Sequence, residues 1–175
     1  GSEMCIRDRD EWIDFRKESF ILPDGKEFSP FYNYSRRNFV VIIARTKEGK
    51  YITVRQFRHG LKKITTEFCA GGIEGNEHES ALLAAKRELQ EETGYVSDHW
   101  KHIYTIPSNP TIADNYAYLY YADDCEKVSN QHLDSTEFLE VKEYTEDEID
   151  DLIKNNEFVQ PIHLMGWLMV KKGLL

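Results

Sequence analysis

The sequence lacks several features that mark large classes of protein. Cysteine occurs three times, at Cys5, Cys69 and Cys125, which is an odd count without a Cys-x-x-Cys pair. A zinc ribbon is therefore excluded, and free thiols in a reducing cytosol are indicated. Long apolar runs are absent too, since Phe39–Ala44 is far shorter than the roughly 20 residues that span a bilayer. We expect a cytoplasmic protein that does not associate with a membrane.

An excess of basic residues is also missing. The chain has 22 Lys and Arg against 31 Asp and Glu, and its net charge is −9. A protein that binds the nucleic-acid backbone carries a basic face, so this balance disfavours a nucleic-acid partner and an enzyme that processes nucleic acids. A small phosphate-bearing substrate remains compatible, because a divalent cation held by carboxylates reverses the local sign of charge.

The first residues carry no apolar signal segment. Gly1-Ser2 is typical of a purification-tag remnant, and the residues that follow are mostly charged. We expect residues 1–11 to be a tag or disordered leader. A length of 175 residues with 41% hydrophobic content then predicts one domain over residues 12–175.

Two β-hairpins are predicted in the first third of the chain. Turn signals at Pro23–Lys26 and Lys47–Lys50 each separate two runs of strand-forming residues. These runs are Trp12–Leu22 with Glu27–Tyr34, and Asn38–Thr46 with Tyr51–Arg58. An isolated hairpin is barely stable, and the first one carries apolar Trp12, Phe15, Phe20 and Ile21. We therefore expect it to form the interface of a homodimer.

Helices and strands alternate in the rest of the chain. The clearest helix spans Ser80–Thr93, because Ser80 can cap its start and Gly94 its end. We expect three further strands and two further helices. The strands are His102–Ile106, Asn115–Ala122 and Glu137–Tyr144, and the helices run from Thr145 to about Lys154 and over Pro161–Lys172. This order predicts an α+β fold with a mixed sheet between helices.

The helix over Ser80–Thr93 carries three carboxylates at its end. At about 100° per residue, Glu88 and Glu92 lie roughly 40° apart, and Glu91 lies within about 100° of both. Like charges in this arrangement repel each other unless a cation lies between them. A hard divalent ion with oxygen ligands is the natural partner. The alternative is a solvated acidic helix face.

The residues around these carboxylates form a longer pattern. Arg87-Glu88-Leu89-Gln90-Glu91-Glu92-Thr93-Gly94-Tyr95, preceded by Ala70-Gly71-Gly72, resembles the Nudix box. In that box, a Gly is followed after five residues by a Glu and after seven more by Arg-Glu-aliphatic-x-Glu-Glu-x-Gly-aliphatic. Glu77 has the correct spacing from Gly71, whereas Glu79 has the correct spacing from Arg87. We interpret this as a two-residue insertion, with Glu79 in the family position.

The resemblance extends to one branch of the family. Val54–Arg58 and Glu67–Gly71 are similar to the ADP-ribose and nucleotide-sugar pyrophosphatases, which have Leu-Pro where this chain has Phe68-Cys69. The first hairpin resembles that branch's N-terminal addition, which exchanges strands in a homodimer. The resemblance covers most of Trp12–Lys172 and implies a Nudix-type mixed β-sheet sandwiched between helices. It further implies hydrolysis of ADP-ribose to AMP and ribose 5-phosphate, or of another nucleotide sugar or dinucleoside polyphosphate.

The same resemblance assigns the metal site. It implies that Glu88, Glu91 and Glu92, with the Ala70 carbonyl, hold Mg²⁺, or Mn²⁺ as the alternative. Because these glutamates are committed to metal, another carboxylate must take the proton from the attacking water. We expect Glu137, at a junction between loop and strand, to be this base and to act together with Glu91. Asp134 is the alternative base, and a solvated loop acid without a role is the other interpretation of Glu137.

Three further residues are candidates for contact with the substrate. We expect Arg55 and Arg58 to share one face of their strand and to clamp the diphosphate, or else to form surface ion pairs. Glu67 either contacts the adenine or ribose or caps a strand edge. The six histidines show no metal-ligand spacing, so we assign none of them a catalytic role. A Nudix-fold module that binds a nucleotide without hydrolysis is the alternative to an enzyme.

Overall fold

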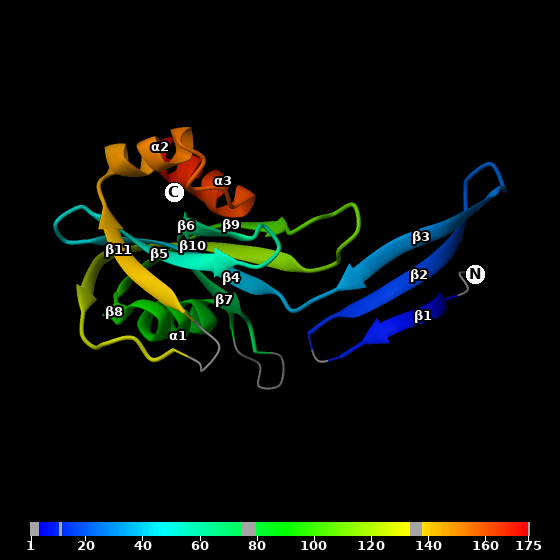
Figure 1. Cartoon of the computed structure of the whole chain (residues 1–175), viewed down its shortest axis with the longest axis horizontal. Helices are drawn as coiled ribbons and strands as arrows, with labels where there is room; N and C mark the ends of the chain where they lie inside the picture. The colour runs from blue at the N-terminus through cyan, green and yellow to red at the C-terminus, as the bar shows by residue number, and fades with distance from the viewer. Residues whose placement is uncertain (1–3, 11, 75–79, 134–137, 175) are drawn as a thin grey trace.

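The computed structural model describes residues 4–10, 12–74, 80–133 and 138–174. They form two parts that differ in shape (Figure 1). An eight-stranded sheet with helices on both faces makes up a core body, and a three-stranded sheet projects from it as an arm. We call these two parts the core and the arm.

The core is built around the hairpin of β4 (Phe39–Thr46) and β5 (Tyr51–Arg58). A tight turn joins them, and Gly49 there has a φ of 84°, a left-handed conformation that glycine adopts without strain. Strand β4 pairs in parallel with β10 (Tyr116–Lys127), while the other pairs in the sheet are antiparallel. The sheet is therefore mixed, and the predicted hairpin is confirmed.

The two strands of this hairpin separate after a short paired stretch. They pair only at Ala44–Ile52 and Arg45–Tyr51. Beyond that point the gap is filled by one segment in two pieces: β6 (Lys63–Glu67) pairs with β5, and β7 (Cys69–Gly72) pairs with β4. We call this arrangement the fork, and Phe68 is the residue at which the chain changes from one ladder to the other. The sequence analysis did not predict β6 or β7.

The remaining strands complete both sides of the sheet. Strand β9 (His99–Pro107) pairs along β10, and the short β8 (Tyr95–Val96) pairs with the end of β10. Strand β11 (Leu139–Tyr144) pairs with β5 on the other side. The three strands predicted in this part of the chain are present, but β9 and β10 are longer than expected.

Helices cover both faces of this sheet. Helix α1 (Ala81–Thr93) lies on one face, and α2 (Glu146–Lys154) and α3 (Pro161–Lys171) lie on the other (Figure 1). The Ser80 side chain accepts a hydrogen bond from the Leu83 N–H, and Gly94 ends α1 with a φ of 77°. Both predicted caps are therefore confirmed, as is the predicted α+β fold.

Two apolar clusters fill the space between sheet and helices. The cluster under α1 includes Ile42, Ile52, Ala84, Ala85 and Leu89, and the cluster under α2 and α3 includes Val41, Ile43, Phe68, Phe158 and Trp167. Alternate residues of β4 enter opposite clusters, as the two-residue period of a strand requires. This double burial explains why β4 is a continuous apolar run.

The arm consists of β1 (Met4–Arg9), β2 (Asp14–Ile21) and β3 (Glu27–Ser35). The predicted hairpin corresponds to β2 and β3, with Gly25 at a φ of 84° in the turn. The expectation that residues 1–11 lie outside the fold is wrong for Met4–Arg9, because their backbone pairs with β2.

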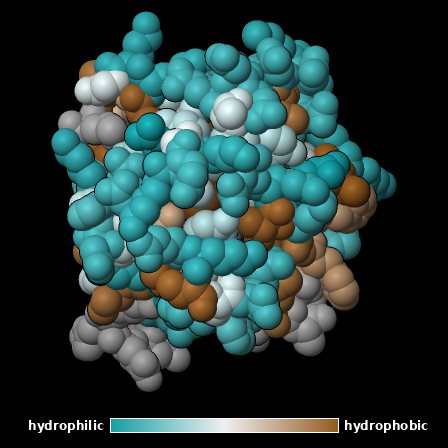
Figure 2. Space-filling model, turned by 90° about the vertical axis from the view of Figure 1, so that its left-hand side faces the viewer, coloured by the Kyte–Doolittle hydropathy of each residue, from teal (hydrophilic) through white to brown (hydrophobic). Residues whose placement is uncertain are grey.

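At the end of the core that lies away from the arm, the surface is mainly hydrophilic, with hydrophobic residues in separate small groups (Figure 2). Within the described residues, no helix has both the length and the apolar character needed to span a bilayer.

Candidate active site

The start of α1's acidic face lies directly against the backbone of β7. A Cβ atom added to Gly71 would come within 1.9 Å of the Glu88 Cδ atom. Only glycine leaves room for the carboxylate at this position. One residue earlier, the Ala70 N–H donates to Glu92 Oε2 at 3.3 Å. The predicted loop residues and the first and last carboxylates of the box are therefore brought together.

Arg87 holds the acidic face in order. Its Nη1 atom lies 2.9 Å from Glu88 Oε1 and 3.0 Å from Glu91 Oε2, and its Nη2 donates to the Gly72 carbonyl at 3.1 Å. One guanidinium thus offsets the repulsion between two glutamates and ties α1 to β7. The sequence analysis included Arg87 in the motif but assigned it no role. Its helical spacing of one and four residues from these glutamates was the available signal.

The three carboxylates differ in their exposure to solvent. Glu92 is 5% exposed, whereas the side chains of Glu88 and Glu91 are 13% and 46% exposed. Among the residues that the structure describes, no group of three or more His, Cys, Asp or Glu side chains is placed so that it could by itself hold a metal ion. The chemistry of the donors nevertheless fits a hard divalent cation, because the carboxylates of Glu88 and Glu92 lie against the backbone of β7.

The last turn of α1 is fixed by the segment after β10. The Gln131 side chain donates to the Glu92 carbonyl at 2.7 Å and to the Leu139 carbonyl at 3.3 Å, and the His132 N–H donates to the Glu91 carbonyl at 2.8 Å. These bonds occupy carbonyls that a helix end leaves without partners. The backbone of α1 is therefore tied to the start of β11.

Arg58 and Glu67 form a bidentate ion pair across β5 and β6. Arg58 Nε and Nη2 lie 2.8 and 2.7 Å from the two carboxylate oxygens of Glu67, which is fully buried. The Thr65 hydroxyl donates to the same carboxylate at 3.2 Å. Two parallel charge-assisted bonds fix the plane of the guanidinium. This burial favours a role for Glu67 in positioning Arg58.

The expectation that Arg55 and Arg58 share a face is wrong. They are three residues apart in a regular strand, and side chains alternate every residue, so they point to opposite faces. Arg55 lies opposite Glu140 in the β5–β11 pair, and the two side chains form an exposed ion pair at 3.4 Å. A joint clamp by these two arginines is therefore excluded in this arrangement.

Four acidic candidates lie outside the described residues. They are Glu77 and Glu79 in the segment before α1, and Asp134 and Glu137 in the segment before β11. The assignment of the base to Glu137 or Asp134 consequently stays a prediction.

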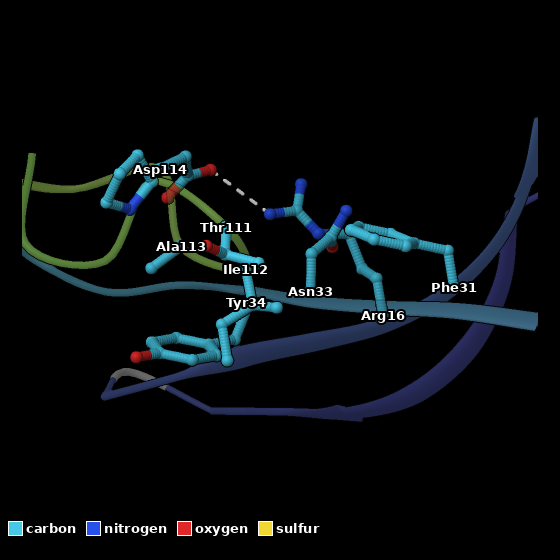
Figure 3. Close-up of a pocket in the computed structure, with 9 residues that line it drawn as sticks. Arg16, Phe31, Asn33, Tyr34, Thr111, Ile112, Ala113 and Asp114 are labelled. Carbon is cyan, nitrogen blue, oxygen red and sulfur yellow. Dashed lines mark hydrogen bonds and ion pairs between the residues drawn. The ribbon is translucent and has the colours of Figure 1, made fainter.

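A hollow lies where the arm meets the core (Figure 3). It has a volume of about 370 Å³ between β2, β3 and the loop from β9 to β10. Arg16 forms an ion pair with Asp114 at 3.1 Å, and the Tyr34 N–H donates to the Ile112 carbonyl at 2.8 Å. Because its residues come from distant parts of the chain, the sequence analysis did not detect this hollow.

Comparison with known proteins places this geometry in a family. A family model described as "NUDIX domain" matches residues 34–163, which span β4 to the start of α3. The chain belongs to the Nudix family. The predicted Nudix box is thereby confirmed as part of a domain that covers most of the core.

Individual relatives indicate which branch of the Nudix family this chain resembles. An ADP-ribose pyrophosphatase of Bacillus subtilis (strain 168) is 32% identical to this Nudix protein over 166 residues, which cover 93% of the chain and 88% of the relative. A methanol dehydrogenase activator of Bacillus methanolicus is 37% identical over 116 residues, which cover 66% of the chain and 62% of that relative. The predicted similarity to the ADP-ribose branch is confirmed.

A solved structure confirms the fold. The crystal structure of an ADP compounds hydrolase matches this Nudix protein with a TM-score of 0.84 at 20% identity, over 99% of the chain and 91% of that structure. Family, relative and fold together confirm the prediction of a Nudix pyrophosphohydrolase.

Proposed function

We propose that this Nudix hydrolase splits ADP-ribose into AMP and ribose 5-phosphate in a reaction that depends on Mg²⁺, with Mn²⁺ as the alternative ion. The observation that carries the proposal is the contact of Glu88 and Glu92 on α1 with the backbone of β7. The similarity to an ADP-ribose pyrophosphatase over 93% of the chain supports the choice of substrate.

The ligand set follows from the orientation of β7. The N–H and C=O of one strand residue point to the same edge of the strand. Since the Ala70 N–H points to Glu92, its carbonyl lies on the same edge and is available to a cation there. Glu88, Glu91 and Glu92 supply the carboxylates. When bound, the cation neutralises the diphosphate and makes water a better nucleophile.

The protein's own residues bind the substrate and move the proton. Arg58 offers a guanidinium that Glu67 fixes in orientation, which suits recognition of a phosphate or a planar base. Glu137 accepts the proton from the attacking water, with Asp134 as the alternative. The chain between Gln131 and Leu139 carries both acids, and both ends of it are tied to α1 through Gln131.

The test is a panel of substrates in the presence of Mg²⁺. It includes ADP-ribose, ADP-glucose, NADH, GDP-mannose and diadenosine polyphosphates, and it measures the released nucleotide. Turnover of ADP-ribose with the highest kcat/KM is expected. Preferred turnover of another member would retain the reaction and change the substrate.

A second candidate function is nucleotide binding without hydrolysis. One relative is named for an action on another enzyme, as a methanol dehydrogenase activator, and not for a hydrolysis. If no member of the panel is hydrolysed but ADP-ribose still raises the melting temperature, this second function replaces the first.

We also propose that the protein acts as a homodimer through its arm. No described residue of β2 or β3 is buried, and the arm exposes large apolar side chains. They are Trp12, Phe15, Ile21, Leu22, Phe28 and Tyr32. A second copy of the arm or core would cover this surface.

A further inference from the structure

At the fork, the backbone N–H group of Phe68 lies outside both strand ladders. The β6 ladder ends at Glu67 and the β7 ladder begins at Cys69, so Phe68 belongs to neither. A buried N–H group without an acceptor destabilises a protein by about 1–3 kcal/mol. Here the acceptor is the side chain of His163 on α3, whose Nδ1 atom lies 3.2 Å from the Phe68 nitrogen.

The state of His163 is suited to this contact. It is 4% exposed, and burial together with the charge of Arg58 lowers its pKa to about 3. The ring is therefore neutral over the physiological range. Because Nδ1 accepts a hydrogen bond, the proton of the ring resides on Nε2.

The fork connects α3 to the proposed metal site through a short stretch of chain from Glu67 to Ala70. Glu67 is held by Arg58, Phe68 by His163, and the Ala70 N–H by Glu92. The Phe68 ring also packs against Phe158 at 5.1 Å and Trp167 at 6.0 Å between ring centroids. The direction of the chain at Phe68 thus decides where the next two residues lie relative to α1.

We propose that His163 is a positioning residue, which fixes the fork so that the Ala70 carbonyl stays within reach of the cation held by α1. The proposal rests on the proposed metal site and adds a residue from the opposite face of the sheet. His163 does not touch the substrate or the cation. It acts by restricting the backbone conformation at Phe68.

Three substitutions separate positioning from simple stabilisation. His163→Asn keeps an acceptor atom on Cγ, where the imidazole has Nδ1, whereas His163→Leu has a similar size and no acceptor. His163→Gln has the same amide group as Asn but places it one bond further from the backbone. Asn and Gln therefore form a matched pair that differs in the position of the acceptor.

The main readout is binding of Mn²⁺ to the protein without substrate, followed by electron paramagnetic resonance at a temperature well below the melting transition. We expect His163→Leu to weaken Mn²⁺ binding by about 10- to 100-fold, the usual effect of losing a group that orients a ligand. His163→Asn should restore binding to within about threefold of the wild type, and His163→Gln should restore it less. If His163→Leu fails to fold, the Asn and Gln pair still decides the question.

Two results would overturn the proposal. One is unchanged Mn²⁺ binding in a folded His163→Leu variant with a lower melting temperature, since that would make His163 purely stabilising. The other is equal binding by the Asn and Gln variants. Glu92→Gln serves as the control for the proposed function: if it binds Mn²⁺ as the wild type does, the metal assignment has failed rather than the role of His163.

Discussion

The arm and the core are both made of β-sheet, yet they bury their side chains in opposite ways. In β4 of the core, six of eight residues are buried, because helices cover both faces of the sheet. In β2 and β3 of the arm, no described residue is buried, and Phe15 and Tyr32 stack at 5.9 Å with 39% and 47% of their surfaces exposed. The core buries its apolar side chains within one chain, whereas the arm leaves its apolar side chains exposed.

This difference in burial separates the part that carries the candidate active site from the part that exposes apolar surface. The core needs its helices to supply both the apolar cover and the acidic site. The arm supplies neither, and it contacts the core through a small polar junction at Arg16, Tyr34 and Asp114. Changes in the core should therefore alter chemistry without altering assembly, and changes in the arm should alter assembly first.

The largest effect is expected from Glu92→Gln in the core. Loss of a carboxylate ligand should raise the activation free energy by several kcal/mol. The Mg²⁺-dependent turnover of ADP-ribose should then fall on the order of 10³-fold. The fold should persist, because a glutamine oxygen can still accept the Ala70 N–H. Relief of repulsion on α1 should leave the metal-free melting temperature equal or higher. Retained turnover that still depends on Mg²⁺ would remove Glu92 from the metal site.

The loss of turnover in Glu137→Gln should be of comparable size. If Glu137 is the base, turnover should fall by about 10²–10⁴-fold with little change in KM. Partial rescue by extra Mg²⁺ would instead identify Glu137 as a ligand. The matched comparison is Asp134→Asn, and a loss below about tenfold in Glu137→Gln would transfer the role to Asp134. Light scattering should report an unchanged dimer in both variants.

Removal of the stacked Phe15 and Tyr32 rings from the arm should instead affect assembly. Phe15→Ser combined with Tyr32→Ser should weaken the homodimer by about 2–3 kcal/mol, or roughly 10²-fold in Kd, if both rings are covered by a second copy. Sedimentation or light scattering across a concentration series measures this shift. Phe57→Ser is the control, since Phe57 is 48% exposed on the core. An unchanged Kd in the double variant would place the interface elsewhere.

The last effect concerns the pH dependence of core stability. Burial and the charge of Arg58 lower the pKa of His163 from 6.5 in the unfolded chain to about 3 in the fold. Below pH 6.5 the unfolded chain therefore binds a proton that the folded chain rejects, so this contribution to stability is present above pH 6.5 and is lost as pH falls. The free energy of unfolding should decrease by about 1.4 kcal/mol per pH unit more in the wild type than in His163→Asn. Urea titrations between pH 7 and 4 measure it, and parallel curves for the two proteins would contradict the assignment.

Local patterns in the sequence predict much of this molecule. The caps of α1 at Ser80 and Gly94 depend on neighbouring residues only, and so does the capping box of α2 at Thr145 and Glu148. The acidic face of α1 follows from helical spacing, and Gly71 follows from the spacing of the box. These features were predictable because each is encoded within a few consecutive residues.

Other features depend on contacts between distant residues and could not be predicted. Strands β6 and β7 form because β4 and β5 separate, and a segment with two consecutive glycines has little strand propensity of its own. His163 acquires its role only where α3 meets the fork, 95 positions from Phe68. The error over Arg55 and Arg58 was of a different kind, since the alternation of side chains along a strand would have excluded a shared face.

The parallel pairing of β4 with β10 has a consequence for the order of events during synthesis. The contact of Tyr116 with Asn38, beside this pair, joins residues 78 positions apart, so the middle of the sheet closes late. Helix α1 is synthesised before β10 and long before α3. A growing chain therefore carries the acidic residues well before it has the sheet and the His163 contact that hold them in place. Affinity for the cation should emerge only after α3 has been synthesised and has packed onto the fork.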